Sequence, residues 1–247
     1  MLSTSVLDVV PSPIEPSDAL AQRTRSPSIP YKVNAWEQAL QAANLLTCFI
    51  DIPSGLHNGF LIDLPSLLSI QSFPNKDSAL TYVNEFHKMI EHELTKGRHI
   101  GPFSEPLLLL LIGPFQSSPI SIIPKPGRPA KFRIIQNFSF PQSLSTHFPN
   151  PSINSYINVA NFPTSWGTFS IVYLLISRLP PGFKAATHNV AEANHTIPLH
   201  QSQWPAAVVH ASHNEFYIDT ETTKLTQELA VKLEQGRDLC QWHSMAD

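Results

Sequence analysis

The sequence predicts an α+β fold, and three observations favour it. A long amphipathic helix is expected from Asp77 to Gly97, and two alternating segments joined by a Pro/Gly-rich turn predict a β-hairpin. Helical and strand patterns then alternate without a regular βαβ period. With 247 residues, 42% hydrophobic and 14% charged, the chain is long enough to bury a core and too apolar to be a highly charged disordered chain.

The first hundred residues divide into two regions. Residues 1–30 are rich in Ser and Pro with no apolar period, which predicts a disordered leader. Residues 31–100 are expected to form a helical lead-in. Asn34 can cap a short helix there, and the Pro-Ser-Gly at 53–55 predicts a turn. The apolar positions of that short helix are Trp36, Leu40 and Ala43.

The helix from Asp77 or Ser78 has the clearest pattern in the chain. Gly97 stands where a left-handed residue commonly ends a helix. The glycines and prolines of the next segment, 97–114, predict a loop-rich connection. The expected apolar face of the helix is Leu80, Val83, Phe86, Met89 or Ile90, and Leu94.

Residues 101–183 are expected to contain a basic hairpin and a helix. Short strands fit 120–123 and 131–136, and the turn between them holds three prolines and a glycine. Thr168 can cap a helix that runs to Leu179. The last region, 184–247, is predicted to hold strands at 184–190, 206–210 and 215–219 and a closing helix at 223–233.

Charge is distributed unevenly, although the net charge is only −3. No Asp or Glu occurs from Pro106 to Ala191, and four cations fall between Lys125 and Arg133. A proline-rich core segment that simply excludes acids would explain the first fact. The clustering instead favours a ribbon that faces phosphates. The basic residues of this stretch are Lys125, Arg128, Lys131, Arg133, Arg178 and Lys184.

Several classes of protein are excluded or disfavoured. No glycine-rich dinucleotide or P-loop motif occurs, and the longest apolar run, 107–112, is too short to span a bilayer. We expect no membrane association and an intracellular location, cytoplasmic or nuclear, because no secretory signal is present. Cys48 and Cys240 stand too far apart in sequence to indicate a zinc knuckle. His210 and His213 have a ligand-like spacing, but polar strand-edge histidines are the better interpretation.

Seven stretches between about residues 80 and 220 follow one another in a recognisable order. They are Glu93–Arg98, Gly101–Phe103, Ser118–Lys125, Lys131–Ser139, Ser152–Asn154, Trp166–Phe169 and Lys184–Leu199. Together they resemble one family, the reverse transcriptases of retroelements, and the similarity suggests fungal retrotransposons of the tyrosine-recombinase class.

The resemblance implies a partial right-hand polymerase, with fingers, an incomplete palm and the helical lead-in. In this family the basic hairpin covers the incoming deoxynucleotide. Lys125 would then meet the terminal phosphates, Arg133 would lie over the base and touch the phosphate chain, and Lys131 would add to the same nucleotide-binding set. The alternative is that these are solvated strand residues.

The palm motif departs from the family at the positions that carry chemistry. Asn189 stands where the family has a magnesium-binding Asp, and a neutral amide holds divalent cations less well than a carboxylate. Asn194 stands where the family has an aromatic residue beside the nucleotide sugar. No Tyr-x-Asp-Asp occurs. The nearest match, Tyr217–Thr220, aligns better with an earlier palm strand. We therefore expect no metal or other cofactor here, although intact relatives use magnesium.

These observations predict a truncated, catalytically inactive retrotransposon reverse transcriptase domain. The ancestral activity would be RNA-directed DNA synthesis by two-metal phosphoryl transfer. An RNA or DNA template-primer is the expected partner of the hairpin, and a separate palm and thumb chain is a second candidate partner. Two alternatives remain: a non-enzymatic RNA- or DNA-binding protein, or a non-functional product whose half palm leaves strand edges unpaired.

Overall fold

The computed structural model describes residues 31–128, 130–146, 148–158, 169–180, 182 and 197–221. The chain forms two compact units. One contains Pro65–Ile153 and Trp204–Thr220, and the other contains Ile29–Leu64 and Asn154–Gln203. In the described part of the chain, no helix has the length and apolar character that a bilayer crossing requires.

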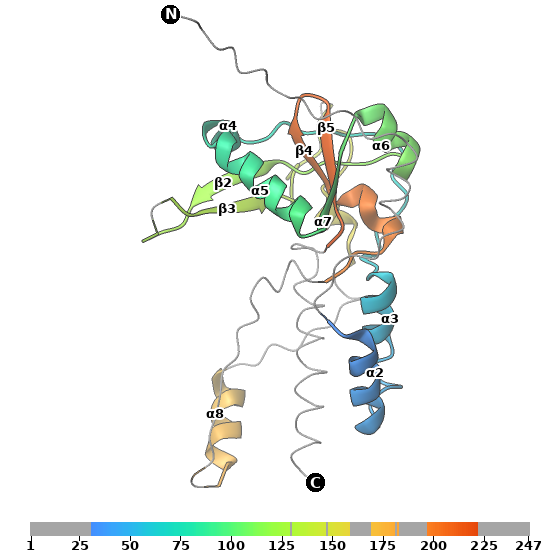
Figure 1. Cartoon of the computed structure of the whole chain (residues 1–247), viewed down its shortest axis with the longest axis vertical. Coiled ribbons are helices and arrows are strands. Elements are labelled where there is room, and N and C mark those ends of the chain that lie inside the picture. Colours follow the sequence, from blue (N-terminus) through green and yellow to red (C-terminus); the bar gives the residue numbers. More distant parts are fainter. Residues whose placement is uncertain are drawn as a thin grey trace, which may run out of the picture. The chain divides into compact units, whose positions relative to one another are not determined.

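A three-stranded antiparallel sheet is the centre of the first unit (Figure 1). Its strands are β1 (His99–Phe103), β4 (Val208–Ser212) and β5 (Glu215–Asp219), in the order β1-β5-β4. β4 and β5 form a hairpin, whereas β1 pairs with β5 across more than a hundred residues of sequence, with His99 opposite Asp219. The central strand therefore comes from the end of the described chain.

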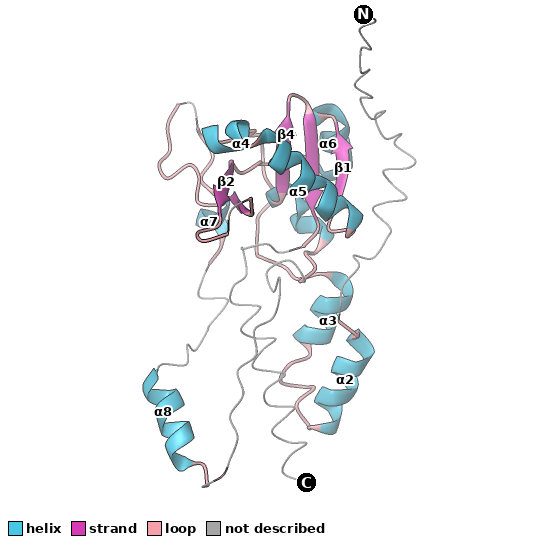
Figure 2. Ribbon diagram, turned by 60° about the vertical axis from the view of Figure 1, so that its left-hand side comes forward, coloured by secondary structure: helices cyan, strands magenta, loops and turns pink. Residues whose placement is uncertain are grey.

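Helices cover this sheet and the neighbouring hairpin. α4 (Asp77–Thr81) and α5 (Val83–Thr95) follow each other directly, and Figure 2 shows α5 crossing in front of the sheet. Phe86 and Ile90 of α5 pack in one core with Ile120 and Ile122 of the hairpin and with Val209 of the sheet. α6 (Glu105–Ile112) contacts β5, and a short helix, α7 (Ile153–Tyr156), begins where this unit ends.

The second sheet is the hairpin β2 (Ile120–Pro124) and β3 (Phe132–Gln136). Its strands are antiparallel, and Ile122 lies opposite Ile134. The alternating pattern of the sequence predicted both strands to within one residue. β5 also lies where it was predicted, and β4 begins two residues later than predicted, because a short 3-10 helix occupies Gln201–Ala206.

The other unit contains α2 (Val33–Ala42), α3 (Asp51–Asn58) and α8 (Phe169–Arg178). α2 and α3 pack through Leu40, Ile52 and Leu56, and Ile197 closes this core. The Gln203 carboxamide accepts hydrogen bonds from the Ile62 and Leu64 backbone N–H groups at 3.3 and 2.8 Å. The short helix near Asn34 and the helix that ends near Leu179 are therefore both present.

Four local predictions were wrong. α2 begins at Val33 with Lys32 as its N-cap, so Asn34 lies inside the helix and does not cap it. The segment 97–114, expected as a loop, forms β1 and α6. The expected turn at 53–55 lies inside α3, where Pro53 occupies the first turn, the position a helix tolerates. The long helix breaks at Tyr82 (φ −111°, ψ 40°), which leaves Leu80 69% and Val83 42% exposed.

Some predictions lie outside the described residues: the strand at 184–190, the helix at 223–233, the cap at Thr168 and the leader 1–30. The boundaries of the four predicted regions stay predictions.

Candidate nucleic-acid interface

The β2–β3 hairpin positions the predicted phosphate-binding residues by simple alternation. Ile120 and Ile122 face the core, so the even-numbered positions of both strands share the buried face. The odd-numbered positions share the opposite face. Arg133 lies there directly across from Ile123, and both side chains are exposed.

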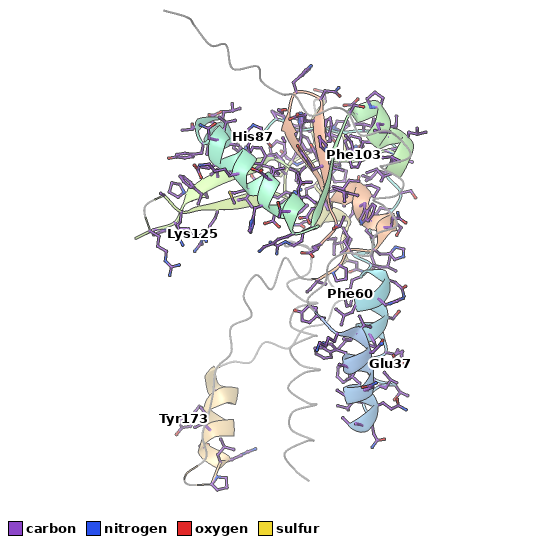
Figure 3. All side chains as sticks on the ribbon, viewed as in Figure 1. Glu37, Phe60, His87, Phe103, Lys125 and Tyr173 are labelled. Atoms are coloured by element: carbon purple, nitrogen blue, oxygen red, sulfur yellow. The ribbon has the colours of Figure 1, made fainter. Side chains whose placement is uncertain are left out.

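The ladder continues one step beyond the strands toward the turn. The Lys125 N–H donates to the Lys131 carbonyl at 2.7 Å, which places these two residues opposite each other in the next odd-numbered pair. Lys131 is exposed and Lys125 is half-buried. Lys125, Lys131 and Arg133, three of the four predicted nucleotide-binding residues, therefore share one face of the hairpin. Figure 3 shows Lys125 at its turn end.

Two backbone hydrogen bonds hold the turn itself. The Arg128 N–H donates to the Lys125 carbonyl, and the Lys131 N–H donates to the Arg128 carbonyl, both at 3.2 Å. Two residues of the turn are left-handed, Gly127 with φ of 67° and Ala130 with φ of 63°. Arg128 is exposed at the tip and adds a fourth cation to the cluster.

The electrostatic setting of these four cations differs from that of two other basic residues, Lys88 and Arg98. Among the described residues, none of the four forms an ion pair with a carboxylate. By contrast, Lys88 pairs with Glu85 at 2.8 Å, and Arg98 pairs with Glu93 at 2.6 Å. Unneutralised cations gathered on one face produce a positive potential that attracts anions.

Apolar side chains lie beside the cations on the same face. Ile123 is 44% exposed, and Ile135 is half-buried. The face therefore combines cations with an apolar strip, which suits a ligand that carries both phosphates and the flat surface of a base. Neither residue was among the predicted site residues, although the period of two that marks the strands also assigns both to this face.

The two predicted palm residues, Asn189 and Asn194, lie outside the described residues. In the described part of the chain, no group of three His, Cys, Asp or Glu side chains could hold a metal ion.

The stretch nearest to a Tyr-x-Asp-Asp motif lies within the central strand β5. The Asp219 carboxylate is buried and lies 3.8 Å from His99 Nε2 of β1. Burial, together with the negative charge of Glu215, raises the pKa of the Tyr217 hydroxyl above its usual value of 10.0, so the phenol stays neutral at physiological pH. This is a packed sheet strand rather than an exposed catalytic hairpin.

The predicted strand-edge histidine is a packed residue of the same sheet. The His210 ring stacks on Phe216 with centroids 4.5 Å apart, and its Nδ1 lies 3.1 Å from the Ser72 hydroxyl. His210 is thus a half-buried strand residue with contacts to Phe216 and Ser72.

Comparison with models of protein families, with curated proteins and with solved structures found no match.

Proposed function

We propose that this chain is a reverse-transcriptase-like domain of retrotransposon type that binds nucleic acid through the β2–β3 hairpin and has no polymerase activity. One observation supports the binding most directly. Lys125, Lys131 and Arg133 share one face of a two-stranded ribbon, and none has a carboxylate partner among the described residues. Phosphates would supply a counter-charge that the described residues do not.

The three side chains suit different parts of a nucleotide chain. Arg133 carries a planar guanidinium that can donate paired hydrogen bonds to a phosphate or stack on a base. Lys125 and Lys131 act as compact charges for phosphates. The exposed Ile123 beside Arg133 offers apolar contact to an unstacked base, which favours single-stranded over duplex nucleic acid.

Salt dependence of binding tests the proposal. We expect the chain to bind a fluorescently labelled single-stranded RNA. The logarithm of the binding constant should fall linearly with the logarithm of the salt concentration. Replacing Lys125, Lys131 and Arg133 together by Ala should flatten that slope by about 0.7 for each phosphate that the variant no longer binds, hence by about 2 in total. The affinity at low salt should fall as well.

A second triple variant controls for the loss of net charge. Lys32, Lys88 and Arg178 are also two lysines and one arginine, are all exposed, and lie on α5 and at the ends of α2 and α8. Replacing these three by Ala should leave the slope nearly unchanged. Equal flattening by both triple variants would show that binding follows overall charge rather than the hairpin, and absence of RNA binding at low salt would refute the proposal.

A further inference from the structure

The hydrogen-bond pattern of the hairpin identifies which backbone groups point out of the sheet. The ladder bonds join Lys125 to Lys131 at one end, and the Asn137 N–H to the Pro119 carbonyl, at 2.9 Å, at the other. Both pairs are odd-numbered, and hydrogen-bonded pairs alternate with non-bonded pairs in an antiparallel ladder. The even-numbered residues therefore direct their N–H and C=O groups away from the partner strand.

The outer edge of β2 is closed by the segment that leads into α4. The Ile120 N–H donates to Asn75 Oδ1 at 3.0 Å, and the Ile120 carbonyl accepts from the Lys76 N–H at 2.9 Å. The Ile122 N–H donates to the Ser78 hydroxyl at 3.1 Å. Pro124, the last outward residue of this strand, has no N–H. The edge of β2 thus offers few free donors.

No described residue covers the outer edge of β3 in this way. The outward N–H and C=O groups of Phe132 and Ile134 have no hydrogen-bond partner among the described residues. Both residues are only half-buried, so this stretch of backbone reaches the surface. The open edge ends at Gln136, which is buried. Its side-chain Nε2 donates a hydrogen bond to the Val208 carbonyl at 3.2 Å.

The buried face of β3 packs against the core of this unit. Phe132 and Ile134 turn their side chains into the core shared with α5, and the Phe132 ring lies 4.9 Å from the Tyr82 ring. Added β-strands commonly bind to a preformed strand with free backbone groups. Because β3 is already ordered, only the incoming segment loses conformational entropy on binding.

Charge selects the kind of strand that fits. Lys131 and Arg133 flank the open positions on the exposed face, and Lys125 lies across from Lys131. Pairing with the same edge of a second copy would gather six cations at one interface, and lysines and arginines on an edge suppress such self-pairing. An extended segment with carboxylates at alternate positions would instead neutralise them.

We propose that the free edge of β3 binds an extended acidic peptide segment of another protein, which adds to the hairpin as a third strand. Backbone hydrogen bonds to Phe132 and Ile134 supply the pairing, and Lys131 and Arg133 select carboxylates at alternate positions. Lys131 and Arg133 also belong to the proposed RNA-binding face, but the backbone pairing at the edge of β3 does not depend on RNA binding.

A labelled synthetic peptide of alternating glutamate and valine is a suitable probe for the full-length chain, with binding measured by fluorescence anisotropy. We expect the peptide with lysine in place of glutamate to bind at least tenfold more weakly. Replacing Lys131 and Arg133 together by Ala should weaken binding of the glutamate peptide by about fivefold, as two exposed ion pairs allow. The matched replacement of Lys88 and Arg178 should change it less than twofold.

Methylation of the peptide backbone separates strand pairing from simple charge attraction without altering the protein. In an added strand, alternate peptide N–H groups point toward and away from β3. N-methylation of one alternate set should therefore reduce affinity at least tenfold, whereas the other set should tolerate it within twofold. An Ile134→Pro variant, which removes an outward N–H, should bind less than Ile134→Val.

Three results would overturn the proposal. Equal losses from the two N-methylated sets would show that no strand pairs with β3. Equal binding of the glutamate and lysine peptides would remove the charge selection. A concentration-dependent dimer of the chain that Ile134→Pro abolishes and Ile134→Val keeps would identify a second copy as the occupant of this edge.

Discussion

Gly59 shows how one residue can determine whether a packing arrangement forms. It follows α3 with φ of 87° and ψ of 150°, a conformation that costs any other residue about 1–3 kcal/mol, and its N–H donates to the Gly55 carbonyl at 2.8 Å. A β-carbon at this position would lie 2.6 Å from the Leu199 carbonyl carbon and closer still to the His200 backbone. The close approach is part of the pairing of Phe60 with Leu199.

We expect Gly59→Ala to lower the free energy of unfolding by about 2–4 kcal/mol, because the backbone strain adds to a steric overlap that only a main-chain shift can relieve. Gly127→Ala is the matched control. Gly127 also has a left-handed φ, 67°, but a β-carbon there meets nothing within 4 Å. That variant should lose only about 1–2 kcal/mol. Urea unfolding of both variants checks the difference, and equal losses would contradict the close approach at Gly59.

At the scale of the element, the break at Tyr82 determines which apolar side chains between residues 77 and 95 are buried. A single helix from 77 to 95 would place Leu80 and Phe86 on the same buried stripe. In the structure, Phe86 is 1% exposed and Leu80 is 69% exposed, because α4 ends at Thr81 and α5 begins at Val83 with a new orientation.

Alanine substitutions distinguish the broken helix from a continuous one. Phe86→Ala should cost about 3–5 kcal/mol of stability, since it empties a packed site between α5 and the hairpin. Leu80→Ala should change stability by less than about 0.5 kcal/mol, as exposed positions usually do. Denaturant midpoints with unchanged slopes provide the measurement. A loss of more than about 2 kcal/mol for Leu80→Ala would indicate that both residues share one buried stripe.

The elements that sequence could predict are those specified by local chemistry. Alternation and a Pro/Gly turn determine the β2–β3 hairpin, and the same alternation brings Lys125, Lys131 and Arg133 to one face. β1 was misread as a loop because its Gly101 is a loop signal in isolation. In the sheet, Gly101 lets the Phe216 carbonyl approach to 2.8 Å of where a β-carbon would stand. The need for a residue without a β-carbon comes from the neighbouring strand β5. No local pattern around residue 101 reveals that neighbour.

At the scale of the whole molecule, the sequence contains the cations expected to bind a nucleotide but lacks the carboxylates expected to catalyse its transfer. The basic hairpin lies in a stretch without acids, whereas two-metal catalysis needs several carboxylates close together. Asn189 takes the position of one such carboxylate by resemblance, and the 247 residues contain no Tyr-x-Asp-Asp to supply the others. Asp219, the nearest substitute, is buried in the central strand of the sheet beside His99.

We therefore expect the purified chain to incorporate no labelled deoxynucleotide on a primed RNA template, with either magnesium or manganese. Asn189→Asp alone should not restore incorporation, because one carboxylate cannot hold two divalent cations against water. The double variant Lys125→Ala, Arg133→Ala sets the background of the assay, since it removes two of the cations proposed to bind phosphates. Template-dependent extension above that background by the unmodified chain would contradict the proposed inactivity. Rescue by Asn189→Asp would identify an unrecognised ligand, with Glu192 and Asp219 the first residues to replace by amides.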